Sequence, residues 1–140
     1  MSRINSVLDI VMEKSFELWR EGEIICLIRR NSGNLCGYCG VSSESPYYKN
    51  DSFDLCAHGG ITYNCSTVPG ISPDIFPGIY WFGFDTSHCG DMLVFSLTMG
   101  NGSFFGSKDF GSYRDFEYVK KQTKRLAKQL QSNNEENNNV

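Results

Sequence analysis

The stretch GIYWFGFDTSHCGDM, residues 78–92, decides how this sequence folds. Ile79–Phe84 is a run dominated by aromatic and β-branched residues between a glycine and an aspartate, which predicts a buried central β-strand. The polar residues Asp85, His88 and Asp91 follow at intervals of three, and a core strand does not need such an ending. We therefore expect the strand to end at a functional site.

A second motif, AHGGITY at residues 57–63, carries the other of the two histidines in the chain. His58 stands beside Gly59 and Gly60, as His88 stands near Gly90, and glycines at such points allow a ligand or a backbone to come close. We expect a strand at Gly60–Tyr63 to lie beside the strand at 79–84. His58 and His88 would then face one cavity.

The rest of the chain supplies further elements. Apolar residues at helical spacing from Ile4 to Trp19, with Gly22 placed to end the run, predict an N-terminal helix. We also expect a hairpin of strands at 23–30 and 35–41, a strand at 92–99, and a helix from Ser112 whose buried stripe includes Phe116, Val119, Thr123, Leu126 and Leu130. The predicted class is α+β, a small antiparallel sheet packed with an N-terminal and a C-terminal helix. Residues 1–131 form one domain, and the Asn-rich residues 132–140 are expected to be disordered.

The composition and charge of the chain limit the classes of partner that it is expected to bind. The chain has 140 residues, 40% of them hydrophobic, and a formal charge of -3, which gives no general reason to expect nucleic acid binding. No apolar run approaches the roughly 18 residues of a membrane span, and the N-terminus does not read as a signal peptide, so a cytoplasmic protein is expected. A homo-oligomer stays an open alternative. Six basic residues of the C-terminal helix are interpreted as a solvated face: Arg114, Lys120, Lys121, Lys124, Arg125 and Lys128.

Six cysteines raise the question of zinc. Cys36 and Cys39 in CGYC have the spacing of half a site, but the sequence has no second C-x-x-C pair. We interpret both as small apolar residues of a strand and predict that they bind no structural zinc.

His and carboxylate residues together suit acid–base catalysis, in which the carboxylate orients an imidazole. The predicted catalytic residues are His58, His88, Asp85 and Asp91. The predicted ligand-binding residues are Gly59, Gly60, Thr62, Tyr63, Trp81 and Gly90. No cofactor and no dedicated metal site are expected, although the same residue types also suit a divalent metal. The alternative is that the aspartates cap turns and that the histidines are structural.

HGGITY followed by YWFGFDTSHCGD resembles a family of small, mostly uncharacterised proteins of phages and mobile elements. The resemblance covers roughly Cys36 to Asp91, with Tyr80 and Cys39 as departures from the pattern. It implies a phage-encoded protein in the host cytoplasm, and small phage proteins often counter host defences by binding or cleaving nucleotide immune signals.

Three functions follow from these observations. The first is hydrolysis of a phosphodiester in a small nucleotide-like ligand by a His/His/Asp site. The second is a non-catalytic sponge that sequesters the same ligand. The third is a structural or protein-interaction module. Hydrolysis is favoured because binding alone rarely requires two titratable imidazoles, but neither motif contains a lysine or arginine to neutralise a phosphate.

Overall fold

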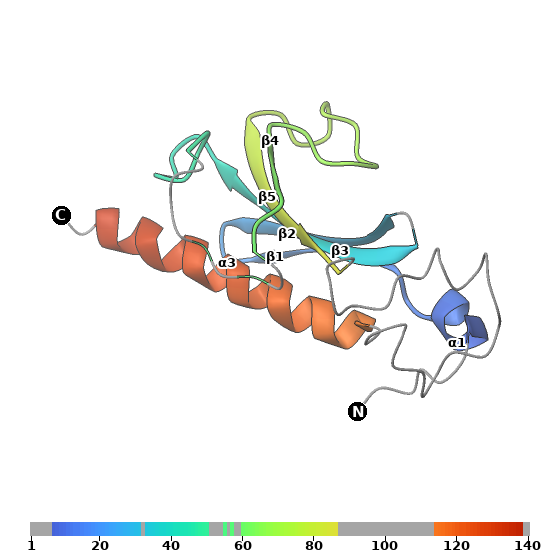
Figure 1. Ribbon diagram of the computed structural model, residues 1–140. Coiled ribbons are helices and arrows are strands. Elements are labelled where there is room, and N and C mark those ends of the chain that lie inside the picture. Colours follow the sequence, from blue (N-terminus) through green and yellow to red (C-terminus); the bar gives the residue numbers. More distant parts are fainter. Residues whose placement is uncertain are drawn as a thin grey trace.

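The computed structural model describes residues 7–31, 33–50, 55, 57, 60–86 and 114–138, except for the side chains of residues 7, 11 and 132–138. Its elements, labelled in Figure 1, are α1 (Val7–Met12), β1 (Phe16–Glu21), β2 (Ile24–Asn31), β3 (Asn34–Ser42), β4 (Tyr63–Cys65), β5 (Ile79–Asp85) and α3 (Phe116–Asn138). The predicted α+β class is confirmed: the described strands form one antiparallel sheet. A short helix precedes these strands in the chain and a long helix follows them.

The sheet has the strand order β1-β2-β3-β5-β4. The hairpin of β2 and β3 is confirmed. β5 lies between β3 and β4, as expected for the central strand, and Gly83 has Tyr38 on one side and Tyr63 on the other. β4 is shorter than the predicted strand, since only Tyr63–Cys65 is extended. The strand expected at 92–99 lies outside the described residues.

The predicted N-terminal helix is wrong in extent. It ends at Met12, and Phe16–Glu21 forms β1, which pairs with β2 along its whole length. Gly22, at φ 62°, makes the turn between these strands instead of ending a helix. Leu8 and Met12, two of the apolar residues at the predicted helical spacing, are exposed, whereas Ile10 is buried.

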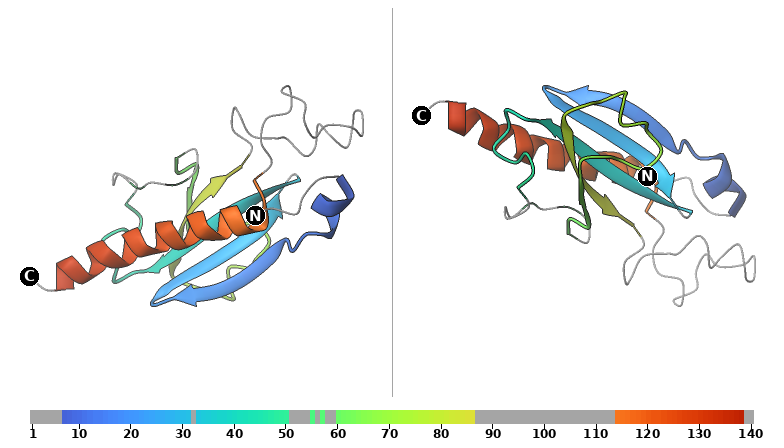
Figure 2. Two further views of the ribbon diagram at one scale, coloured as in Figure 1. Left: turned by 90° about the horizontal axis from the view of Figure 1, so that it is seen from below. Right: turned by 90° about the horizontal axis from the view of Figure 1, so that it is seen from above.

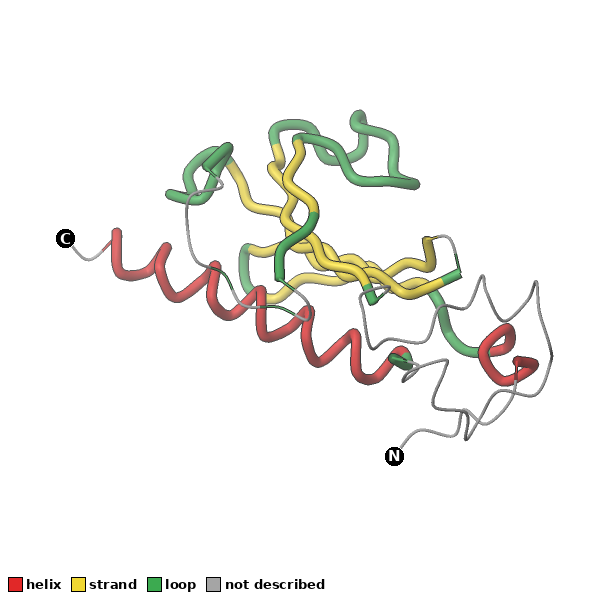
Figure 3. The backbone as a smooth tube through the Cα atoms, viewed as in Figure 1, coloured by secondary structure: helices red, strands yellow, loops and turns green. Residues whose placement is uncertain are grey.

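Different elements cover the two faces of the sheet. α3 crosses one face (Figures 1 and 3), and its side chains from Phe116 to Leu130 pack with Phe82 and Phe84 of β5 in the larger core. On the other face a smaller cluster, which includes Leu27, Tyr38 and Trp81, packs against Val68, Ile71 and Phe76 of the loop of residues 66–77. The predicted stripe of α3 is therefore confirmed from Phe116 onward. The division into a domain 1–131 and a disordered tail 132–140 stays a prediction.

The start of α3 is tied to the N-terminal part of the chain. Glu13 Oε2 accepts a hydrogen bond from the Phe116 N–H at 2.7 Å, and Asp115 Oδ1 accepts one from Tyr118 N–H at 2.9 Å. Arg30 pairs with Glu13 at 3.3 Å and donates to the Gly33 carbonyl at 2.7 Å. The bonds donated by Phe116 and Tyr118 satisfy N–H groups at the start of α3 that have no partner within the helix, and Arg30 holds Glu13 in position.

α3 packs very closely against the sheet at Gly37 of β3. A Cβ atom on this residue would lie 2.3 Å from Thr123 Oγ1 and 2.6 Å from the Phe84 ring. Thr123 is fully buried and donates to the Val119 carbonyl at 2.7 Å, so it cannot turn away without losing that bond. Only glycine allows this helix and this strand to come so close.

We expect Gly37→Ala to lower the free energy of unfolding by about 1–3 kcal/mol, because the added methyl group overpacks the contact between β3 and α3. Urea denaturation followed by circular dichroism measures the change. The exposed Ser43→Ala serves as the control and should change stability little. A Gly37→Ala protein as stable as the parent would show that α3 does not pack against β3 in this way.

Candidate functional site

The end of β5 is fixed by two buried hydrogen bonds. Thr86 Oγ1 donates to the Leu35 carbonyl at 2.9 Å, and Asn34 Nδ2 donates to the Thr86 carbonyl at 3.0 Å. Thr86 and Asn34 are both buried, and a buried polar group that loses its partner costs about 1–3 kcal/mol. These bonds determine where β5 stops and therefore where Asp85 lies.

A hydrogen bond joins Asp85 to the second motif. Thr62 N–H donates to the Gly83 carbonyl at 2.9 Å, and Thr62 Oγ1 donates to Asp85 Oδ2 at 3.4 Å. In the sequence, His58 is four positions before Thr62 and His88 is three positions after Asp85. The structure thus brings together the two segments that carry the histidine motifs.

Five of the predicted site residues lie outside the described residues: His58, Gly59, His88, Gly90 and Asp91. The convergence of the two imidazoles on one cavity therefore stays a prediction. Thr62, Tyr63 and Asp85 are the predicted residues that the structure brings close to one another.

Sequence reasoning missed Arg29. Arg29 of β2 lies directly opposite Cys36 of β3, and Cys36 lies directly opposite Asp85 of β5. Residues opposite one another in an antiparallel sheet share a face, so these three side chains form a row on the face away from α3. The pairing register creates this row from residues that are far apart in the sequence, and no local motif signals it.

The Arg29 side chain is held in place by packing. It is partly buried, and a Cβ atom on Gly70 would lie 2.9 Å from its Cζ, so the guanidinium lies against the turn of the 66–77 loop. In the part of the chain that the structure describes, no acceptor forms a hydrogen bond or ion pair with this guanidinium. A half-buried cation in such a position favours an anionic ligand.

Two tyrosines lie beside this row. Gly83 has no side chain, and a Cβ atom there would lie 2.5 Å from Tyr38 Cδ1, so the Tyr38 ring extends across β5. It meets the Tyr63 ring edge-to-face, with centroids 5.4 Å apart. Burial raises the pKa of the Tyr38 hydroxyl, and the neighbouring Cys36 adds to the rise, so this hydroxyl stays protonated and can act as a donor.

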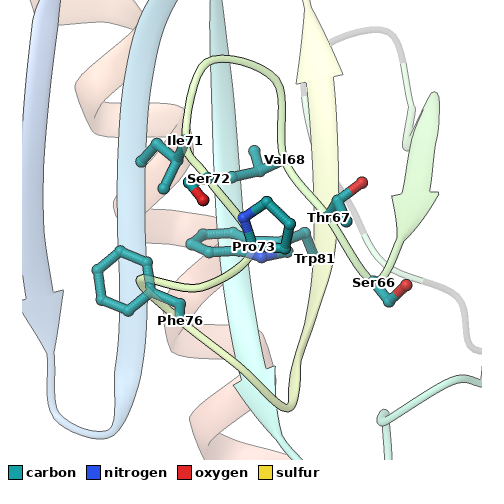
Figure 4. A pocket seen from close by; sticks show the side chains of 8 residues that line it. All are labelled: Ser66, Thr67, Val68, Ile71, Ser72, Pro73, Phe76 and Trp81. Carbon is teal, nitrogen blue, oxygen red and sulfur yellow. The ribbon is translucent and has the colours of Figure 1, made fainter.

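Other predicted ligand-binding residues are already engaged. Trp81 is only 2% exposed and packs with Phe76, Val68 and Ile71 beneath the 66–77 loop (Figure 4). The cavity beside its ring has a volume of about 10 Å³, room for one water at most. A base could stack on Trp81 only if this loop moved. The Gly60 N–H donates to the Ala57 carbonyl at 2.9 Å and is not available to a phosphate.

A larger groove of about 410 Å³ runs along α3 and is lined by Glu117, Lys120, Lys121 and Lys124. The positive charge of the lysines that line this groove is partly neutralised by ion pairs. Lys120 pairs with Glu17 at 3.0 Å, and Lys124 pairs with Glu21 at 4.0 Å. This groove is distant in sequence from the histidine motifs, and its ion pairs favour the solvated-face interpretation.

The sulfur atoms of Cys36 and Cys39 lie on opposite faces of β3. Cys36 belongs to the cluster around Trp81, whereas Cys39 Sγ donates to the Thr123 carbonyl of α3 at 3.4 Å. Burial, aided by Asp85, raises the pKa of Cys36 to about 11, and burial also raises the pKa of Cys39. One metal ion cannot reach both sulfur atoms, and no group of three metal-ligating side chains occurs among the described residues.

No family model, curated protein or solved structure matches this chain. Among the described helices, none is long and apolar enough to cross a membrane.

We predict that the protein purified without chelator contains much less than one zinc per chain, because the sulfur atoms of Cys36 and Cys39 lie on opposite faces of β3 and cannot bind the same ion. Elemental analysis measures the content. One equivalent of zinc that disappears in a Cys36→Ser variant would contradict the prediction.

Thiol reactivity should separate Cys65 from the buried cysteines. Hydrogen bonds with Thr67 lower the pKa of Cys65, while Cys36 and Cys39 have raised pKa values. At about pH 7.5 we expect iodoacetamide to modify Cys65 at least about 100-fold faster than Cys36, because the thiolate is the reacting species. Peptide mass spectrometry measures the rates. Unfolded protein is the control, in which the two rates should converge; equal rates in the folded protein would be the contrary result.

Proposed function

We propose that the protein binds a small nucleotide-like ligand at the end of β5 and hydrolyses its phosphodiester bond. The observation that carries this proposal is the Thr62–Asp85 hydrogen bond, which joins the segments bearing the two histidine motifs. A pair of imidazoles can act as base and acid only if both reach the same substrate. The bond supports this arrangement because Thr62 is four positions after His58 in the sequence and Asp85 is three positions before His88.

The proposed reaction needs one base and one acid. One of His58 and His88 takes a proton from water while the water oxygen attacks phosphorus. The other histidine gives its proton to the leaving oxygen as the original phosphorus–oxygen bond breaks. Asp85 or Asp91 orients one imidazole and stabilises its charged form.

The described residues supply binding functions that the motifs lack. Arg29 neutralises phosphate charge, because its guanidinium has no described partner and lies in one row with Asp85. Tyr38 and Tyr63 offer aromatic surface and a protonated hydroxyl beside that row. The motif resemblance suggests the ligand class: a nucleotide immune signal, encountered by a phage-encoded protein in the host cytoplasm.

Turnover tests the proposal directly. The purified protein is incubated with a panel of cyclic mononucleotides, cyclic dinucleotides and linear dinucleotides, with and without chelator, and products are identified by liquid chromatography and mass spectrometry. We expect one of these to be cleaved. His58→Ala and His88→Ala should each lower kcat at least about 100-fold, because a general acid or base contributes 10²–10⁴-fold. Arg29→Met should mainly raise KM, whereas Arg125→Met, on the exposed face of α3, should change neither constant.

The same experiment separates the alternatives. If one ligand molecule binds per protein chain and is released intact on heating, the protein is a sponge. The His58, His88 and Arg29 variants would then bind the ligand more weakly, and no product would form. Neither binding nor turnover across the panel would overturn the proposal and favour a structural role for the motifs.

A further inference from the structure

We propose that β1 is an interface at which a second copy of this chain adds its own β1, antiparallel, to continue the sheet. β1 is an outermost strand in the order β1-β2-β3-β5-β4. No described element runs along its outer side in either view of Figure 2. Backbone N–H and C=O groups on such an edge are available to another strand.

The side chains of β1 support association on the face away from α3. Phe16 is 52% exposed and Leu18 is 40% exposed, although both are large and apolar. They alternate with Glu17 and Trp19, which point to the α3 side and contact Lys120. The exposed apolar pair therefore lies on the face away from α3, at the outermost of the described strands.

Charge selects one register for this pairing. A two-fold axis perpendicular to the sheet keeps every side chain on its own face, so the axis must pass through a residue of β1. An axis at Glu17 places two glutamates opposite each other, and an axis at Trp19 opposes Glu17 to Glu21 of the second copy. Like charges directly opposite are destabilising in antiparallel pairs.

An axis at Leu18 avoids these conflicts. It places Leu18 against Leu18 of the second copy and Phe16 against Arg20 of the second copy, where a guanidinium can lie over an aromatic ring. These contacts cover the two exposed apolar residues and need no rearrangement of the sheet.

On the face covered by α3, the same register brings opposite charges of the two copies together. Leu18 on the axis brings Glu17 of the second copy opposite Trp19. The Lys120 ammonium lies 5.3 Å from the Trp19 ring centroid and 3.0 Å from Glu17 Oε1, and hydrogen bonding to Lys120 lowers the pKa of Glu17. Each Lys120 can thus stand between two ionised carboxylates, one from each copy.

Solution mass tests the proposal. Sedimentation equilibrium of the full chain from about 1 µM to about 500 µM covers the range expected for a small interface. We expect a reversible monomer–dimer equilibrium. Leu18→Lys should weaken it at least about tenfold, because two ammonium groups would meet on the axis. Ile75→Lys is the matched control, since Ile75 is also exposed (61%) but lies in the 66–77 loop, and it should leave the equilibrium unchanged.

A cysteine variant reports the register itself. Leu18→Cys should form a disulfide between two copies under mild oxidation, because directly opposed residues have Cα atoms about 4.5–5.5 Å apart. Mass spectrometry should identify the peptide joined through position 18, while Ile75→Cys should give no link through position 75. A monomer mass at all concentrations, a dimer indifferent to Leu18→Lys, or the absence of the position-18 link would each overturn the proposal.

Discussion

The close contact between α3 and β3 at Gly37 is the constraint on which the larger core depends. α3 covers the face of the sheet that carries Phe82 and Phe84, and its buried stripe reaches that face only because Gly37 leaves space for Thr123 and the Phe84 ring. Thr123 is bonded along the helix, and its carbonyl accepts a bond from Cys39. One missing side chain thus sets the distance between the helix and the sheet.

The end of β5 depends on polar contacts. Asn34, Leu35 and Thr86 form two buried hydrogen bonds that stop the strand, and Thr62 then bonds Asp85 across the neighbouring edge. Buried polar bonds are specific in direction, because each fails if its partner moves. Apolar residues of the core can therefore be exchanged for other apolar residues, whereas Asn34 and Thr86 at the end of β5 tolerate few substitutions.

The sequence predicted what depends on local pattern. β5 and the β2–β3 hairpin were found because their runs of aromatic and β-branched residues have flanking turn signals. The sequence predicts a helix at β1 because Trp19 and the apolar residues before it fit helical spacing as well as alternation, and only pairing with β2 decides between the two. Arg29 was missed for a related reason: its place in one row with Cys36 and Asp85 follows from registers across three strands, which no short motif records. The histidine site stays a prediction.

The order of elements along the chain has a consequence for folding. β1, β2 and β3 are consecutive and pair through short turns, so their contacts are local and can form quickly. The helix that covers the larger core begins only at Phe116, and its contact with Glu13 closes a loop of about a hundred residues. During synthesis the apolar face of the early strands is therefore complete before its cover has been made. A nascent chain that stalls before α3 would expose that face to chaperones and to other chains.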